Sequence, residues 1–348
     1  MMEGSLDTLP KSDVSFELIT KALLNNSQPF PPVYLHRFSD LSPSNLHDLE
    51  QIWNEILPDR RAALLEDLEN LAEADTLVSF DELSKFALND TDPRVRQTAL
   101  QILWESNEPN LIPKFIYMLE NDEDTHVRAA AASTLGQFIY LGELEEISKH
   151  WLDQAEDHLI KVYQSDEDSL VRRRALESLG FSSRQDIAAF IRQANNNEDP
   201  DWIGSALFAM GRSADPKWVP DVLEMLDHPN TEVQLQAVRA LGELEDPQGR
   251  APLIELMENG IEDDDVRLAA IWSLSKIGGE KVREILEQLL DETEDEDEAE
   301  LIEDAMENLY LTEGFDKFGM FDFDPKDQDE LDSFIDLEHD NPDDDPDS

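Results

Sequence analysis

The chain has 348 residues, of which 40% are apolar, and its 81 acidic against 27 basic residues give a formal net charge of −54. A surface this acidic repels nucleic acid and anionic membranes, which excludes both as direct ligands, and it attracts cations and basic proteins. The chain contains no cysteine, which excludes disulfides, thiolate metal sites and cysteine nucleophiles. We expect a cytoplasmic protein, because no basic leader with an apolar core and no apolar run near the roughly 18 residues of a membrane span is present.

Residues 1–41 are predicted to form an N-terminal extension. Apolar residues at helical spacing indicate a short helix in VSFELITKALLNN, from Val14. The next segment, QPFPPVYLHRFSDL from Gln28, is rich in proline and aromatic residues and is predicted to run extended across a surface. Residues 42–89, with helix starts at Ser42 and Pro58, are predicted to form a degenerate helical cap, because the end of a repeat array must not expose an apolar face.

Residues 90–311 are predicted to form an array of repeats. The block DPRVRQTALQILW returns six more times, at intervals of 31 to 44 residues. The copies begin at Asp92, Asp124, Asp168, Asp199, Asn230, Asp263 and Glu298. In the first six copies the leading Asp or Asn suits a helix N-cap, and in all copies apolar residues follow on one stripe. A second apolar helix follows in most copies, so the unit is a pair of antiparallel helices and the array is a solenoid.

The block D-x-x-V-R-x-x-A-L-x-x-L-G, with its second helix and a period near 31, resembles HEAT repeats, and more narrowly the short HEAT-like repeats of the phycobilisome lyase type. The resemblance covers roughly residues 90–310. It implies an all-α fold, an α-solenoid built as a right-handed superhelix of antiparallel helix pairs of the HEAT/armadillo kind. It also implies a structural ladder between neighbouring units, formed here by Asp92, Arg96, Asp124, Arg128, Asp168, Arg172, Asp263 and Arg267 and interrupted at Ile203 and Gln234.

Two segments depart from the regular repeat. The interval of 44 residues between the second and third copies holds about a dozen extra residues around FIYLGELEEISKHWL, from Phe138, which predicts a prolonged helix or a projecting loop. Residues 312–348 are predicted to be a disordered acidic tail, since residues 291–348 contain 26 acidic and 2 basic side chains. The tail carries an aromatic motif of Phe315, Phe318, Phe321, Phe323 and Phe334.

The sequence contains no pattern that predicts catalysis, a metal site or a cofactor. No histidine pair has zinc-protease spacing, and the His-Glu dipeptides of one HEAT-like di-iron hydroxylase family are missing. Phosphate-binding loops and nucleophile elbows are also missing. Acidic clusters before the helices lack the glycine and glutamate of a calcium-binding loop, and their recurrence favours helix capping.

The favoured function is a non-enzymatic scaffold or adaptor that binds a protein partner, for which a basic protein is one candidate. Solenoids often bind through a concave face, here expected to be lined by the second helices. The candidate partner-binding residues are Lys114, Tyr117, Lys161, Arg192, Trp218 and Arg283. One variant has the acidic tail fold back onto the protein's own Lys114 and Tyr117 face. The alternatives are a phycobilin-lyase-like enzyme or assembly chaperone, which the resemblance implies, and an acidic chaperone for basic proteins. The sequence leaves the partner and the oligomeric state open.

Overall fold

The structure is a computed structural model that describes residues 15–279 and 281–317, with side chains through Leu311. Within these residues every regular element is an α-helix or a short 3-10 helix, so the predicted all-α solenoid class is confirmed. Contacts divide the chain into two units, which we call unit 1 (residues 1–215) and unit 2 (residues 216–348). The division falls inside the predicted array of residues 90–311; the four predicted domain limits stay predictions.

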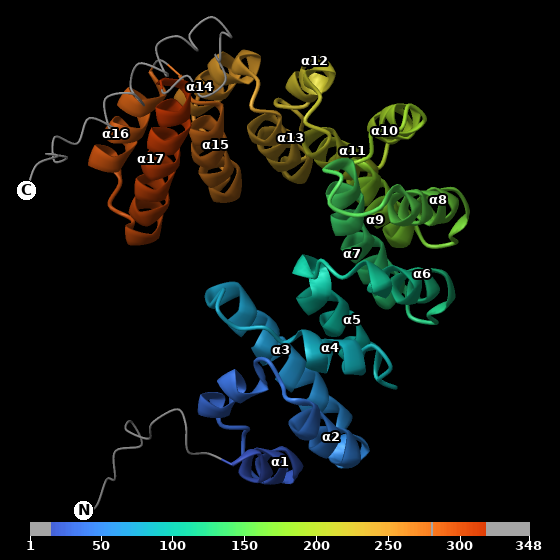
Figure 1. The fold of residues 1–348 in the computed structure, drawn as a ribbon. Coiled ribbons are helices and arrows are strands. Elements are labelled where there is room, and N and C mark those ends of the chain that lie inside the picture. The colour runs from blue at the N-terminus through green and yellow to red at the C-terminus, as the bar shows by residue number, and fades with distance from the viewer. Residues whose placement is uncertain (1–14, 280, 318–348) are drawn as a thin grey trace, which may run out of the picture. The chain divides into compact units, whose positions relative to one another are not determined.

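Unit 1 contains eleven α-helices in its described residues (Figure 1). They are α1 (Phe16–Leu24), α2 (Pro43–Ile52), α3 (Pro58–Ala74), α4 (Asp81–Ala87), α5 (Pro93–Ile102), α6 (Ile112–Asn121), α7 (Thr125–Glu143), α8 (Lys149–Ser165), α9 (Ser169–Leu179), α10 (Ile187–Asn195) and α11 (Pro200–Arg212). Short 3-10 helices connect some of them, namely η1 (Pro32–Phe38), η2 (Trp53–Glu55), η3 (Leu103–Glu105) and η4 (Pro109–Leu111).

The proline-rich segment is folded, so the prediction of an extended run from Gln28 is wrong. Pro32–Phe38 forms the 3-10 helix η1, because the φ that a proline ring fixes also suits a 3-10 turn. The aromatic side chains hold this turn in place. The ring of Phe38 is fully buried, with its centroid 6.1 Å from those of Phe16 and Phe30. The N-terminal extension therefore adds its own small core to unit 1.

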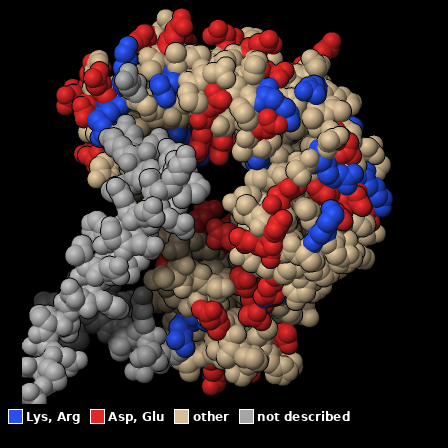
Figure 2. Space-filling model, turned by 45° about the horizontal axis from the view of Figure 1, so that its top comes forward, with Lys and Arg blue, Asp and Glu red and all other residues tan. Residues whose placement is uncertain are grey.

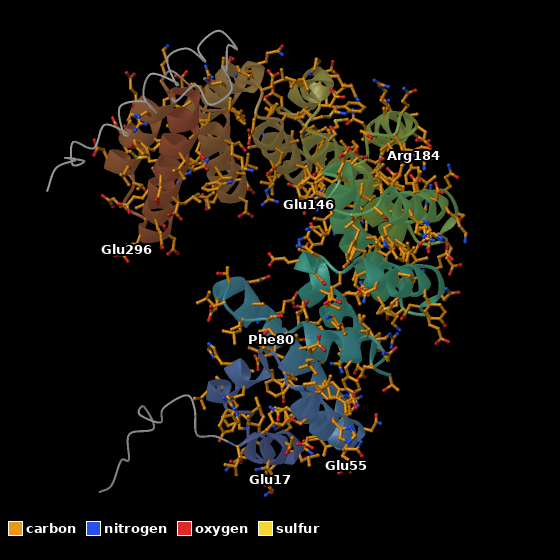
Figure 3. All side chains as sticks on the ribbon, in the orientation of Figure 1. Glu17, Glu55, Phe80, Glu146, Arg184 and Glu296 are labelled. Carbon is orange, nitrogen blue, oxygen red and sulfur yellow. The ribbon has the colours of Figure 1, made fainter. Side chains whose placement is uncertain are left out.

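Two layers of helices make up the rest of unit 1. The first helices of the repeats, α5, α7, α9 and α11, each begin at a repeat block, and successive first helices pack against one another. The second helices α6, α8 and α10 form the other layer, and each packs against the first helix that follows it. Side chains from both layers fill the space between them (Figure 3). This arrangement confirms the helix pairs expected from the repeat.

Small residues bring successive first helices close together. A Cβ atom on Gly136 of α7 would lie 2.8 Å from the Ser178 hydroxyl of α9, and one on Gly180 would lie 2.7 Å from the carbonyl oxygen of Ala209 in α11. Such close approach shortens the layer of first helices, so unit 1 bends with that layer inside and α6, α8 and α10 outside (Figure 1). The prediction that second helices line the concave face is therefore wrong for unit 1.

The extra residues between the second and third copies prolong two helices. The helix α7 has 19 residues and α8 has 17, whereas α5 and α6 have 10 each. The side chain of Phe138 is buried in α7, and Tyr140 is 43% exposed. Of the two outcomes left open by the sequence, the prolonged helix is the observed one.

Unit 2 continues the same alternation of first and second helices. Its elements are η5 (Pro216–Trp218), α12 (Val219–Leu223), α13 (Thr231–Leu244), η6 (Pro247–Gly249), α14 (Arg250–Glu258), α15 (Asp264–Ile277), α16 (Val282–Glu292) and α17 (Glu296–Lys317). The first helices α13, α15 and α17 pack in sequence, and Gly242 of α13 allows the close approach of Ser273 in α15.

The last repeat begins three residues earlier than its sequence alignment indicates. Asp295, and not Glu298, accepts the first-turn hydrogen bond, from the backbone N–H of Glu298 at 3.0 Å. The helix α17 then continues to Lys317, past the predicted tail boundary at residue 311, and it includes the backbone of Phe315. The other residues of the predicted tail motif, Phe318, Phe321, Phe323 and Phe334, lie outside the described residues.

Candidate protein-interaction site

Arginines of the repeat blocks connect successive repeats through ion pairs. Arg96 Nη2 in α5 lies 2.6 Å from Asp122 Oδ1, and Arg128 Nε in α7 lies 3.1 Å from Asp166 Oδ2. All four side chains are at least four-fifths buried. Removing one partner from such a pair leaves an uncompensated charge, so each pair fixes the stacking of its two repeats.

The carboxylates in these pairs differ from those predicted for the ladder. Each ladder carboxylate stands two residues before the leading Asp of a block, whereas the predicted ones cap their own helices. The four predicted carboxylates, Asp92, Asp124, Asp168 and Asp263, accept from the backbone N–H groups of Arg94, His126, Leu170 and Val266, respectively. The expected N-caps are therefore present, and the ladder uses a different set of acids.

Of the other two predicted ladder arginines, Arg172 contacts a backbone carbonyl and an aromatic ring, whereas Arg267 forms a further ion pair between successive repeats. Arg172 Nε donates to the carbonyl oxygen of Tyr163 at 2.8 Å, and its guanidinium lies 5.1 Å from the ring centroid of Trp202. Burial raises the pKa of Tyr163, while the positive charge of Arg172 acts against that shift. Arg267 pairs with Glu298 of α17 at 2.6 Å. At the two predicted interruptions, Ile203 is buried and Gln234 Nε2 donates to the carbonyl oxygen of Leu226.

One arginine of unit 1 is surrounded by aromatic rings from several repeats. The guanidinium carbon of Arg212, in α11, lies 4.3, 4.7 and 5.3 Å from the ring centroids of Phe208, Phe181 and Trp104. The ring of Tyr140, at the prolonged end of α7, continues the group with its centroid 5.3 Å from that of Phe181. We call these five residues the Arg212 surface. Tyr140 is 43% and Phe208 37% exposed, so the surface meets solvent although its members also hold repeats together.

A shallow groove adjoins the Arg212 surface on the first helices of unit 1. It has a volume of about 340 Å³, and Trp104 belongs to both features. Its walls include Gln97 and Gln101 from α5, His126 from α7, and Leu170 and Arg174 from α9. Among the described residues that line it there is no Asp or Glu. The groove is thus a local exception on a chain with 81 acidic residues.

The comparison with protein families decides the classification of the chain. The family model for HEAT repeats matches residues 80–180 and 219–307, which together are more than half of the sequence. The chain belongs to the HEAT-repeat family. The family assignment agrees with the ladder and with the two helix layers, and it confirms the resemblance seen in the repeat blocks. A search of curated protein sequences gives no match.

Several solved structures are similar to this HEAT-repeat chain at low sequence identity. The phycocyanin lyase complex of CpcE and CpcF from Nostoc sp. PCC7120 is 22% identical over 66% of this chain and 94% of that one, with a TM-score of 0.44. The Escherichia coli YibA protein is 16% identical over 82% and 98%, with a TM-score of 0.43. Human deoxyhypusine hydroxylase is 16% identical over 75% and 95%, with a TM-score of 0.33.

The predicted partner-binding residues of the HEAT array are divided between the two units, four in unit 1 and two in unit 2. Lys114 Nζ donates to Asn89 Oδ1 at 2.7 Å and lies 5.9 Å from the ring centroid of Tyr117, which is 63% exposed; burial lowers the pKa of Lys114. Lys161 Nζ pairs with Glu120 at 2.7 Å, and Arg192 is exposed on α10. These four residues lie on the second helices of unit 1.

The remaining two candidates belong to unit 2. Arg283 is half-buried on α16. Trp218 is 1% exposed, because its ring packs in the core beside Val219, so this indole is not available to a partner. The sequence places Trp218 on a second helix, where an exposed aromatic side chain could contact a partner. In the structure the large apolar ring is buried instead.

Several basic side chains on the second-helix layer form ion pairs with nearby carboxylates. Arg184, labelled in Figure 3, lies 2.7 Å from Asp157 and 3.1 Å from Asp186, and Lys149 lies 2.8 Å from Asp153. Figure 2 shows acidic side chains spread widely over the face in view, with basic ones among them. These ion pairs mean that the basic side chains named here do not form a row of free cations on the second-helix layer.

The described residues contain no group of three His, Asp or Glu side chains placed to hold a metal ion. Among the helices of the described ranges, none combines the length and the apolar composition that crossing a bilayer requires.

Four residues of the Arg212 surface were not predicted from the sequence, namely Trp104, Phe181, Phe208 and Arg212. The only signal they gave is that aromatic or arginine side chains recur at the carboxyl ends of the first helices.

Proposed function

We propose that the protein is a non-catalytic HEAT-repeat scaffold that binds a protein partner through the Arg212 surface of unit 1. The observation that supports this most strongly is the grouping of three rings around Arg212, each within 5.3 Å of its guanidinium. Aromatic side chains and arginine are enriched among the residues that dominate binding energy at protein interfaces. Here they come from four successive first helices or their ends, so a partner would contact several repeats at once.

The exposure of Tyr140 and Phe208 supports the same proposal. Both are large aromatic side chains, and 43% and 37% of their surfaces meet solvent, so an interface would bury apolar ring surface on both. The Arg212 side chain keeps the rings in fixed positions through its stacking contacts and through the 3.3 Å hydrogen bond that Nη1 donates to the carbonyl oxygen of Glu177. A partner would therefore meet a surface that is ordered in advance, which lowers the entropic cost of binding.

Affinity capture from a lysate of the source cell tests the proposal when matched variants are compared. One variant carries Tyr140→Ser and Phe208→Ser together, and the control carries Tyr117→Ser, which changes an exposed ring on α6. Proteins retained by the native chain and by the control, and lost from the double variant, are the expected result. Loss on Tyr117→Ser with retention by the double variant would contradict the proposal, provided that circular dichroism shows both variants folded.

A further inference from the structure

The groove beside the Arg212 surface has walls whose chemistry selects among partners. On a chain of net charge −54, the groove walls contain a cation and no carboxylate. Arg174 is 44% exposed there; its Nη1 pairs with Glu177 Oε2 at 2.6 Å, and other N–H groups of the guanidinium stay available to an acceptor. A basic segment would place like charges beside Arg174 and Arg212, which costs free energy at an interface.

Two other hollows show that this property is local. The hollow between α13, α15 and α17 of unit 2 has Glu243 and Asp265 in its walls beside the basic Arg239 and Lys276. The hollow on the second-helix side of unit 1 has four acidic residues in its walls and two basic ones, Arg128 and Lys161. In both places a carboxylate-bearing ligand would meet carboxylates of the wall as well as cations, and those carboxylates repel it. The groove on the first helices of unit 1 is the one among these three that accepts an acidic segment without that repulsion.

The polar side chains of the groove suit a peptide backbone. Gln97 and Gln101 stand one helical turn apart on α5, and neither makes a side-chain hydrogen bond within the described residues. Each amide offers two donors and an acceptor, which matches the N–H and C=O groups of an extended chain. Trp104 and Leu170 supply the apolar contact for side chains of that chain.

We propose that this groove binds an extended segment of a partner protein in which aspartate or glutamate alternates with aromatic side chains. The proposal rests on the proposed function and adds the chemistry of the partner. The carboxylates meet Arg174 at one end of the groove, and the aromatic side chains contact Trp104 and the adjoining Arg212 surface. Extended peptides present alternate residues to opposite sides, so one segment serves both contacts.

Fluorescence anisotropy with a defined peptide tests the proposal. The probe is a fluorescein-labelled peptide of residues 318–334 of this chain, FGMFDFDPKDQDELDSF, because its sequence has the required alternation. The comparison peptide has asparagine and glutamine in place of every aspartate and glutamate. Binding is measured to the full chain with Phe321→Ala and Phe323→Ala, which weakens competition from the chain's own copy of this sequence.

Two substitutions of opposite charge at one position of the groove supply matched variants. Gln101→Glu puts a carboxylate into the groove and is expected to weaken binding of the acidic peptide about fivefold, whereas Gln101→Lys is expected to tighten it about threefold, both less at high salt. The control is Gln193→Glu, the same chemical change on an exposed position of α10, which should alter binding by less than about twofold. Equal effects of Gln101→Glu and Gln193→Glu would overturn the proposal, as would equal affinity for the amide peptide.

The experiments distinguish failure of the peptide-groove proposal from failure of the proposed function. If the acidic peptide does not bind but the Tyr140 and Phe208 double variant still loses a captured protein, the partner chemistry is wrong and the interaction surface stands. If the peptide binds and responds to Gln101 while capture does not depend on the double variant, the groove is a peptide site and the role given to the Arg212 surface is wrong.

Discussion

Arg96 Nη2 in α5 lies 2.6 Å from Asp122 Oδ1, across the boundary between two successive repeats. Asp122 also accepts the backbone N–H of Asp124, the residue that caps the next first helix. One carboxylate thereby joins the arginine of one repeat to the start of the next helix. The same arrangement recurs with Arg128, Asp166 and Asp168, so it is a repeating joint of the array.

The first prediction concerns this joint. Replacing Arg96 by alanine leaves Asp122 buried and unpaired, which we expect to lower the free energy of unfolding by about 3 kcal/mol. Arg94 lies two residues earlier and is 53% exposed, so its ion pairs with Asp59 and Asp92 are solvent-screened and Arg94→Ala should cost clearly less stability than Arg96→Ala. Urea unfolding followed by circular dichroism measures both. Equal losses would show that the buried pair does not hold the repeats together.

The close approach of first helices gives a second prediction. Gly180→Ala places a methyl group against the backbone of Ala209, which can move only if α11 shifts, so we expect a loss of about 2 kcal/mol or more in stability. Gly249→Ala is the comparison, because its methyl group would meet the side-chain ends of Ile277 and Leu241 at 3.2 and 3.4 Å. The expected order of thermal midpoints is native, then Gly249→Ala, then Gly180→Ala. The reverse order of the two variants would contradict the proposed origin of the bend.

Unit 1 should also show a specific dependence on pH. Burial, followed by repulsion from Glu73 and Glu66, raises the pKa of Glu69 in the folded state. The protonated form is then favoured by folding, so the ionised form costs stability above the folded pKa, and this cost disappears as pH falls to the unfolded pKa of about 4.3. We therefore expect Glu69→Gln to raise the urea midpoint near neutral pH and to have little effect below about pH 4.

A carboxylate with the opposite shift serves as the control. Glu17 accepts a hydrogen bond from Lys21, and this contact lowers the pKa of Glu17. Its contribution is present above the unfolded pKa and is lost as pH falls through the folded one, so Glu17→Gln should not raise the midpoint near neutral pH. If both substitutions shifted the midpoint in the same direction, the assignment for Glu69 would be wrong.

The repeat architecture could be predicted from the sequence because each copy carries its own local signals. The leading Asp residues cap their helices, and the stripe of Val95, Ala99 and Leu100 is buried as its spacing predicts. The identity of the ladder carboxylates was also encoded, in the Asp-x-Asp spacing of Asp90 and Asp92 and its later copies. One Asp in each block already satisfies the capping motif, and an acid two residues earlier has the same sequence pattern as a solvated surface charge, so spacing alone does not assign it to the ladder.

The candidate site could not be predicted from the sequence in the same way. Which helix layer lies inside the bend depends on contacts such as Gly180 with Ala209, which join residues far apart in sequence. The grouping of Trp104, Phe181 and Phe208 around Arg212 likewise combines side chains from three separate segments. Spacing within one helix carries no information about such encounters, so the sequence pointed to Lys114 and Tyr117 on the other layer.

If a protein partner covers the Arg212 surface, hydroxyl-radical footprinting of the captured complex will show it. Oxidation of Tyr140 and Phe208 is measured by mass spectrometry with and without the partner, and the exposed ring of Tyr117 on the second-helix layer is the internal reference. We expect the partner to protect Tyr140 and Phe208 and to leave the oxidation of Tyr117 unchanged. Protection of Tyr117, with Tyr140 and Phe208 oxidised as in the free protein, would contradict it.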